Sequence, residues 1–304
     1  MRLDRWVELM WRDLLELVRA PAALSVPGDA IAGAAAADCV SGRTAGLAAA
    51  SVCLYYAGMA ANDWADRELD EIERPERPIP SGRVTPSQAL TVASGLTAAG
   101  LGIAALAGGR RALSVAVPLT AAIWAYDLKW KNTAQGPAVM AACRGLDVLL
   151  GASGGRITRA LPTAAVVAAH TYVVTELSRH EVHGADASLA RKTLPATAAI
   201  AAAATSLTRP SGTPSRPART SGMSGVDKGA AAALSGWYLK RFGTAQRKVM
   251  DKPNAEHVRA AVGAGIMALP ALQGALTARQ GRPVLGALVA LGAALGKRLA
   301  RRAT

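Results

Sequence analysis

The chain has 304 residues, of which 51% are apolar and 18% are charged, and its formal net charge is +14 at pH 7. An excess of basic residues is also typical of nucleic-acid-binding proteins, but here Lys and Arg gather in the gaps between long apolar runs, as they do in membrane proteins. The composition therefore argues against a nucleic-acid partner and against a soluble helical protein, and it predicts a chain embedded in the lipid bilayer.

Runs without charged residues mark the expected membrane spans. Residues 44–62, 84–109 and 260–278 carry no Asp, Glu, Lys or Arg, and roughly 20 mainly apolar residues are enough to cross the hydrocarbon layer. Alternation with period two is absent, so we expect an all-α, multi-pass transmembrane helical bundle of nine or ten helices, forming one domain over 1–304. The eighth span contains Lys240 and Arg241 and is alternatively an interfacial helix. The expected spans are 21–40, 44–62, 86–108, 111–127, 135–153, 160–177, 192–208, 229–245, 258–278 and 283–299.

Residues 1–19 predict a helix that lies along the membrane surface. Basic and acidic side chains are mixed there with apolar residues at helical spacing, which is typical of an interfacial amphipathic helix. The segment lacks the apolar central block of a secretory signal. It is expected to lead into the first span.

Three polar gaps are expected to open on the same side of the bilayer as the N-terminus. They are 63–85, 128–134 and 178–191, and each follows an even-numbered span. Arginines near the N-terminus predict that this side is the cytoplasmic face of the plasma membrane, where the gaps form one polar mouth. Residues 209–227, on the other side, are rich in Pro, Ser and Gly and predict a flexible loop.

The second span ends in NDWADRELD, which carries the first candidate site. On a helix Asn62, Asp66 and Asp70 lie at i, i+4 and i+8 on one face, with Asp63 one position round from that row. Amide and carboxylate oxygens, together with substrate phosphates, are typical ligands of Mg²⁺. The alternative is a solvated loop held by i, i+4 ion pairs such as Asp63–Arg67.

Basic residues follow this acidic stretch within RPERPIPSGR. Prolines stiffen the segment and end the preceding helix, so Arg74, Arg77 and Arg83 are expected to be held in place. Planar guanidinium groups suit bidentate contacts to phosphate. An acidic face followed by arginines is the pairing that a magnesium–diphosphate complex requires, with Arg77 as the expected substrate contact.

Together these two segments resemble the first signature of the UbiA superfamily of intramembrane prenyltransferases, NDxxDxxxD followed by RPxxxG, and they are most similar to an actinobacterial branch of it. The resemblance covers nearly the whole chain, because polar signatures recur in the later gaps. It implies a helical bundle around a central lipid-facing cavity. It also implies an enzyme that uses Mg²⁺ to transfer a prenyl group from a prenyl diphosphate to an aromatic or lipid acceptor.

The gap after the fourth span contains YDLKWKNT, which is similar to the family's tyrosine-and-lysine segment. The similarity implies that Tyr126 and Lys131 contact the diphosphate, and that Lys129 takes part in catalysis with Asp66 and Asp70. The alternative is an interfacial belt of aromatic and lysine side chains.

Other charged residues have expected roles around this mouth. Arg19 precedes Ala20 and Pro21 and resembles the family's Arg-Pro, so it either reaches the phosphates or anchors its helix at the interface. Arg179 is a further candidate for neutralising the departing diphosphate. Arg144 and Asp147 interrupt the fifth span, and because charges at membrane depth are costly, they are expected to form a structural ion pair.

The second acidic signature departs from the family pattern. The family has DxxDxxxD before Thr-Leu-Pro, and here TLP is present at 193–195 with Asp186 where the last aspartate belongs. His180 and His183 stand where other aspartates are expected, beside Glu181. Glu181 and Asp186 are therefore the expected protein ligands of a second Mg²⁺, and the alternative is a different metal favoured by the histidines. The spacing in HEVH does not match the HExxH of zinc proteases.

A non-enzymatic function is the main alternative. The altered second signature favours a homologue that binds or moves a lipid diphosphate without turnover. A purely structural bundle would not need NDxxDxxxD intact.

Overall fold

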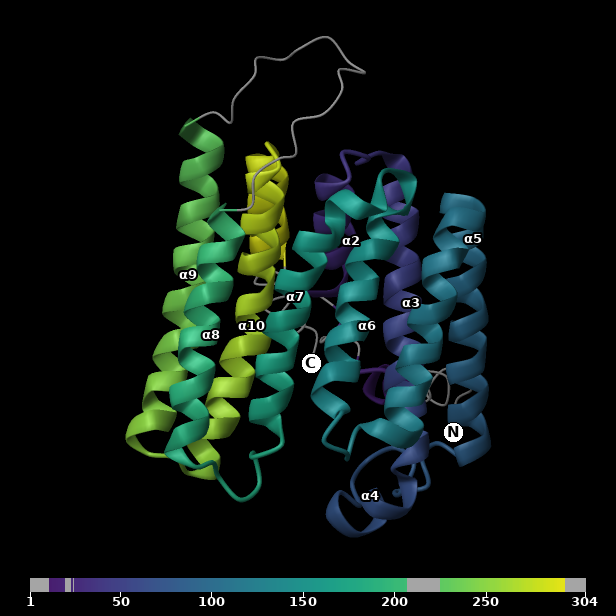
Figure 1. The fold of residues 1–304 in the computed structure, drawn as a ribbon. Helices are drawn as coiled ribbons and strands as arrows, with labels where there is room; N and C mark the ends of the chain where they lie inside the picture. The colour runs from purple at the N-terminus through teal and green to yellow at the C-terminus, as the bar shows by residue number, and fades with distance from the viewer. Residues whose placement is uncertain (1–10, 20–22, 24, 207–224, 293–304) are drawn as a thin grey trace.

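The computed structural model describes residues 11–19, 23, 25–206 and 225–292, and this part of the chain is an all-helical bundle without strands (Figure 1). Residues 1–10 of the expected amphipathic helix lie outside the described part, and residues 11–17 are helical. The expected flexible loop at 209–227 also lies outside it, apart from 225–227, which begin a helix. The helices are α2 (Val26–Ala36), α3 (Gly42–Ala65), α4 (Arg67–Glu73), α5 (Pro86–Ala125), the π-turn η2 (Tyr126–Trp130), α6 (Gly136–Gly151), the 3₁₀ turn η3 (Ala152–Gly154), α7 (Ile157–Ser178), α8 (Ala187–Ser206), α9 (Gly225–Asp251), α10 (Ala255–Arg279) and a shorter helix Pro283–Gly292.

Four of the described helices are long and apolar enough to cross a membrane: α3, α5 continued through η2, α7 and α10. The remaining long helices pack against them but are shorter or more polar. Of the expected first span 21–40, α2 covers only 26–36, and residues 37–40 are not helical. In contrast, α9 is longer than the expected 229–245 and continues to Asp251.

Helix α5 contains two of the expected spans. Gly109 breaks it with φ 63° and ψ −150°, a backbone conformation that is essentially restricted to glycine. The chain reverses direction at Gly109, and the two halves of α5 run side by side in Figure 1. A hydrogen bond joins them, in which Trp124 Nε1 donates to Thr97 Oγ1 at 3.2 Å. A capping box at Thr85 and Gln88 fixes where the first half begins.

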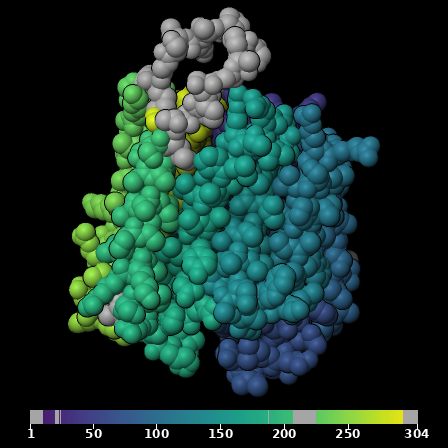
Figure 2. All heavy atoms as spheres, in the orientation of Figure 1, coloured from purple at the N-terminus to yellow at the C-terminus, as the bar shows by residue number. Residues whose placement is uncertain are grey.

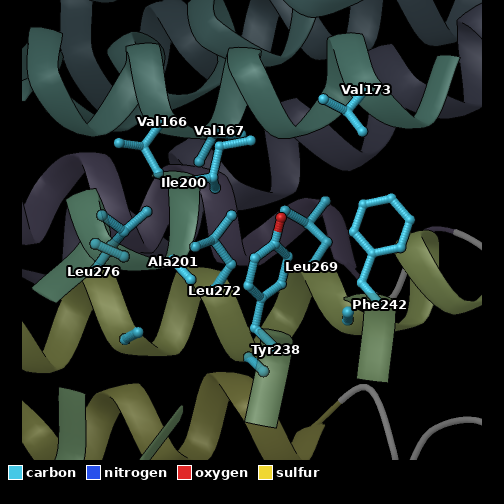
Figure 3. Close-up of a cluster of buried hydrophobic side chains, with 14 of the residues drawn as sticks. Val166, Val167, Val173, Ile200, Ala201, Tyr238, Phe242, Leu269, Leu272 and Leu276 are labelled. Atoms are coloured by element: carbon cyan, nitrogen blue, oxygen red, sulfur yellow. The ribbon is translucent and has the colours of Figure 1, made fainter. Parts of the chain in front are cut away.

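Small residues allow the helices to approach closely. A Cβ added to Gly33 of α2 or to Gly151 of α6 would overlap the backbone of the other helix, as is typical of helix pairs in membranes. Larger side chains fill the space between α7, α8, α9 and α10, where Tyr238 and Phe242 are fully buried among Val, Ile and Leu (Figure 3). The interior is therefore mostly aliphatic.

The polar connections gather at one end of the bundle. The α3–α4–α5 connection projects at the lower end in Figures 1 and 2. Arg179, after α7, donates to Thr133 O at 2.8 Å in the η2–α6 connection, and Ala185 N–H donates to Pro253 O at 2.9 Å before α10. The three gaps expected to share a mouth therefore lie at the same end.

Candidate functional site

Two buried carboxylates of the NDWADRELD segment share one arginine. Asp63 and Asp70 are 4% and 2% exposed. Arg77 Nη1 lies 2.5 Å from Asp70 Oδ2 and 3.4 Å from Asp63 Oδ1, while Arg19 Nη2 lies 2.7 Å from Asp63 Oδ1. Asp63 and Asp70 can share a partner because they are seven residues apart, which is two helical turns. Arg74 is more distant, at 4.0 Å from Asp70.

The other two candidate metal ligands of the segment, Asn62 and Asp66, face η2. Lys131 Nζ lies 2.5 Å from Asp66 Oδ1, and Asn62 Nδ2 donates to Asp127 Oδ1 at 3.1 Å. Asp127 is buried and lies within electrostatic range of Asp66 and Lys131. The four residues Asn62, Asp66, Asp127 and Lys131 therefore form a second polar group beside the Arg77 pairings.

The expected single face is thus divided in two. Asp66 ends α3 and precedes α4, and the backbone hydrogen bonds continue from Asn62 O to Asp66 N and from Asp66 O to Asp70 N. The side chains nevertheless have different partners, because the basic groups lie on two sides of the helix. Arg19 and Arg77 pair with Asp63 and Asp70, and Lys131 pairs with Asp66. The pair Asp63–Arg67, named for the alternative of a solvated loop, is not formed, because Arg67 donates to Trp64 O and Glu68 instead.

The backbone geometry of the π-turn η2 determines which side chains of YDLKWKNT point into the mouth. Lys131 N–H donates to Tyr126 O at 2.9 Å, which closes the turn. π-turns inside helices are frequent at functional sites, and this one turns Asp127 inward and leaves Lys129 exposed. Tyr126 lies within electrostatic range of Asp66 and Arg179. Lys131, and not Lys129, is the lysine held against a carboxylate of this mouth.

The segment before the first span is tied to the mouth by Arg83. Its guanidinium donates to Asp13 at 2.6 Å and to Glu16 at 2.8 Å. The hydrogen bond from Arg83, together with its positive charge, holds the pKa of Glu16 below its ordinary value against the opposing effect of burial. Arg83 therefore fastens residues 13–16, just before Arg19, to the connection between α4 and α5.

Arg19 itself has a left-handed backbone with φ 48°, which is uncommon for a residue other than glycine. That conformation ends the helical segment at 11–17 and lets the side chain reach Asp63.

The residues of the second signature are spread over the connection between α7 and α8. Asp186 is exposed, and its Oδ1 accepts from Ser188 N–H at 3.1 Å at the start of α8, which is a helix-capping contact. Glu181 is partly buried, and burial raises its pKa against the charges of Arg259 and Arg74. Because the charge of Arg74 acts on Glu181, this connection lies near the first signature.

A buried polar network lies deeper in the bundle. Arg144 Nη2 is 2.8 Å from Asp29 Oδ2, and Gln273 Nε2 donates to Asp29 Oδ1 at 2.6 Å. Asp147 accepts from Ser51. The expected pair Arg144–Asp147 is therefore wrong in its partner, because α2 places Asp29 against Arg144.

The donor chemistry at the mouth fits a hard divalent cation, since amide and carboxylate oxygens are its preferred ligands. Within the described residues, however, no three His, Cys, Asp or Glu side chains gather closely enough to hold a metal. This holds also for His180, His183 and Glu181. The carboxylates are instead paired with the basic groups of the mouth, so a cation would have to displace these pairings.

The sequence interpretation missed Asp127 as a site residue. It stands at the end of an otherwise uncharged run beside Tyr126, and a charge at that depth is expected to face a partner or a cavity.

The fold and the charged mouth define a multi-helix membrane protein, and comparison with known proteins gives its family. The model of the UbiA prenyltransferase family matches residues 25–211, more than half of the chain. Digeranylgeranylglyceryl phosphate synthase of Methanopyrus kandleri is 36% identical over 192 residues, which cover 60% of this chain and 69% of that protein. Chlorophyll synthase of Oryza sativa subsp. japonica is 32% identical over 104 residues, covering 32% of this chain and 28% of that one.

A solved structure of a digeranylgeranylglyceryl phosphate synthase shares the fold, with a TM-score of 0.62 at 15% identity over 89% of this chain and 98% of that one. The chain belongs to the UbiA prenyltransferase family, and its class of reaction is prenyl transfer.

Proposed function

We propose that this protein uses Mg²⁺ to transfer a prenyl group from a prenyl diphosphate to a lipid acceptor, with the mouth facing the cytoplasm at the plasma membrane. The observation that carries the proposal is the pairing of Arg19, Arg77 and Lys131 with carboxylates at one end of the bundle. These are the basic and acidic groups that a magnesium–diphosphate complex needs, already brought together.

The proposed ligands of Mg²⁺ are Asn62, Asp63, Asp66 and Asp70. When bound, the ion offsets the negative charge of the leaving diphosphate. Asp127 sits behind Asn62 and accepts its amide hydrogen at 3.1 Å, so it orients the Asn62 oxygen away from itself. Residues in such an outer shell commonly tune metal affinity.

We propose that the basic groups of the mouth exchange their carboxylate partners for phosphate oxygens when the substrate binds. Arg19, Arg77 and Lys131 are each paired with a carboxylate in the structure, and each is the type of side chain that binds phosphate oxygens. The diphosphate would take these donors, and the freed carboxylate oxygens would face the ion. Preorganised positive charge at the departing oxygens is usually a large term in catalysis.

Two further side chains at the mouth are proposed to contact the diphosphate. Arg179 and Tyr126 lie on the rim of the mouth, with Arg179 tied to Thr133 O. Lys129, which is exposed, is proposed to meet phosphates only at the outer edge. Glu181 and Asp186 stay candidates for a second ion, and the capping contact of Asp186 would have to open for this.

A lipid acceptor is favoured over an aromatic acid by the relatives. The protein that is 36% identical is named for making digeranylgeranylglyceryl phosphate. We therefore propose that the acceptor is a membrane alcohol with a polar head group.

Product analysis tests this proposal. Purified protein in phospholipid nanodiscs would be incubated with Mg²⁺, geranylgeranyl diphosphate and either geranylgeranylglyceryl phosphate or 4-hydroxybenzoate, with Asp66→Ala as the inactive control. A mass gain of one prenyl group on the lipid alone supports the acceptor class. A gain on the aromatic acid alone refutes it.

The second candidate is a protein that binds a lipid diphosphate without turnover. The histidines at 180 and 183 favour it, because they replace carboxylates that the family uses. Tight Mg²⁺-dependent binding of geranylgeranyl diphosphate, with neither product nor diphosphate release under any acceptor, would select this candidate.

A further inference from the structure

A cavity of about 330 Å³ lies at the end of the bundle remote from the acidic mouth. It is formed where α2 meets α3, where α5 reverses at Gly109, and where α6 passes into η3. Helix α3 separates it from Asn62 and spans about 36 Å at 1.5 Å per residue, so the cavity is distinct from the site proposed above. Its lining residues include Cys39, Ser41, Arg43, Thr44, Arg111 and Ser153.

The lining is positively charged. Arg43 and Arg111 are exposed side chains on its wall, and within the described part of the chain neither takes part in an ion pair. The nearest acidic residue along the chain, Asp38, has Arg282 at 3.8 Å as an ion partner. Two guanidinium groups at one cavity favour a ligand with several anionic oxygens.

Helix α3 adds a second source of positive potential. It begins at Gly42, between the lining residues Ser41 and Arg43, and Ser41 N–H donates to Thr44 Oγ1 at 3.1 Å. The first N–H groups of a helix lack intrahelical acceptors and, with the helix dipole, favour anions. The N-terminus of this helix therefore lies beside both arginines.

A buried hydroxyl without a partner points to a ligand independently. Ser153 is 1% exposed, and its Oγ makes no hydrogen bond to any of the described residues. It lines the cavity together with Gly108, where an added Cβ would lie 3.4 Å from that oxygen. Buried polar groups are nearly always hydrogen-bonded, and an exception calls for a water, ion or ligand.

We propose that this cavity binds a phosphate group, presented either by an anionic phospholipid at the membrane surface or as free phosphate. Arg43 and Arg111 contact the anionic oxygens from the open side, and Ser153 donates its hydroxyl from the closed side. Leu47 and Ala107 supply an apolar wall, which suits the glycerol and upper acyl portion of a lipid. The proposal does not depend on the proposed prenyl transfer.

The test uses two probes on the full chain in neutral detergent. Retention of phosphatidylglycerol is counted by native mass spectrometry against phosphatidylcholine, and inorganic phosphate is titrated by thermal shift. The Arg43→Gln/Arg111→Gln protein is compared with Arg110→Gln, a matched control at an exposed arginine in the same turn that does not line the cavity. Lys131→Ala is included as a control for phosphate bound at the acidic mouth. A phosphate-dependent thermal shift that is lost in Lys131→Ala but kept in the double variant would place the anion at that mouth and not in the cavity.

The expected result is weaker binding by about tenfold per arginine, as for loss of one charge-assisted hydrogen bond, with Arg110→Gln unchanged. Ser153→Ala should weaken binding without lowering the unfolding temperature of ligand-free protein, because its hydroxyl has no hydrogen-bond partner in the described part of the chain. Selective retention of phosphatidylglycerol identifies a lipid head group, and a phosphate-dependent shift identifies the free anion. Equal binding by the double variant and Arg110→Gln, or no binding of either probe by the unaltered protein, overturns the proposal.

Discussion

Lys131 reaches Asp66 from a different helix, with Nζ 2.5 Å from Oδ1 and both side chains mostly buried. The contact joins the end of α3 to the end of η2, and it holds the aspartate at the mouth before any substrate is present. A lysine in this position can pass from the carboxylate to a phosphate oxygen with little movement.

Lys131→Ala is expected to lower kcat/KM by about 10²–10³-fold, the usual cost of removing one preorganised charge-stabilising donor. Lys129→Ala, at an exposed position two residues earlier, is expected to change it several-fold at most. Steady-state release of diphosphate measures both. A larger loss for Lys129→Ala would show that η2 rearranges and that Lys129 is the catalytic lysine.

Asp127→Asn is expected to raise the Mg²⁺ concentration needed for half-maximal activity by about 10–100-fold, as for other residues behind metal ligands. The substitution keeps the size of the side chain but removes the negative charge that receives Asn62 Nδ2. Mg²⁺ titration of initial rates checks this. Glu68→Gln, an exposed carboxylate on α4, is the control, and an equal shift in both variants would refute a role for Asp127.

Gly109→Ala is expected to lower the free energy of unfolding by about 1–3 kcal/mol, because its backbone conformation is strained for any residue with a Cβ. Gly102→Ala, within the first half of α5 and with open space around its Cβ position, is expected to be neutral or stabilising. Thermal unfolding in detergent compares them. Equal stability of the two variants would contradict a fixed reversal at Gly109.

Arg144→Met is expected to destabilise the protein by about 3–5 kcal/mol, since it leaves Asp29 buried without its positive partner. Adding Asp29→Asn should recover most of that loss. Denaturant unfolding of the single and double variants measures the difference. Failure of the second substitution to rescue stability would mean that Arg144 acts chiefly through contacts other than Asp29.

The pair Arg83–Glu16 should make stability depend on pH. The pKa of Glu16 lies below its ordinary value of 4.5 when folded, so the stabilisation is present above that value and is lost as pH falls through the folded pKa. Glu16 is half exposed, and such pairs contribute about 0.2–1 kcal/mol. Arg83→Gln should thus unfold at a lower temperature than the unaltered protein at pH 7, and this difference should close as pH falls below 4.5 and through the folded pKa of Glu16, while Arg12→Gln shows no such gap. A gap that persists at the lower pH would contradict the assignment.

Sequence patterns predicted much of the fold because hydropathy and glycine placement act locally. The uncharged runs identify α3, both halves of α5, α7 and α10, and the short gap at 109–110 marks the reversal. They did not predict that Asp29 pairs with Arg144, since partners from distant helices depend on how the helices pack.

At the mouth, residue types were predictable and partners were not. NDWADRELD and Arg77 mark an acidic and basic cluster, and the structure brings them together. The sequence could not show that Asp63 and Asp70 share Arg77 while Asp66 turns to Lys131, because η2 changes the helical register before Lys131. The same register change exposes Lys129 and buries Asp127.

The central claim is that the mouth ionises a prenyl diphosphate with the help of Mg²⁺ held by its acidic residues. The most direct test is diphosphate release from geranylgeranyl diphosphate by the purified protein with an acceptor, with and without Mg²⁺, beside Asp66→Asn. The account predicts release that requires Mg²⁺ and falls to background in Asp66→Asn, while both proteins stay folded. Release that is independent of Mg²⁺ or unchanged in Asp66→Asn would contradict it.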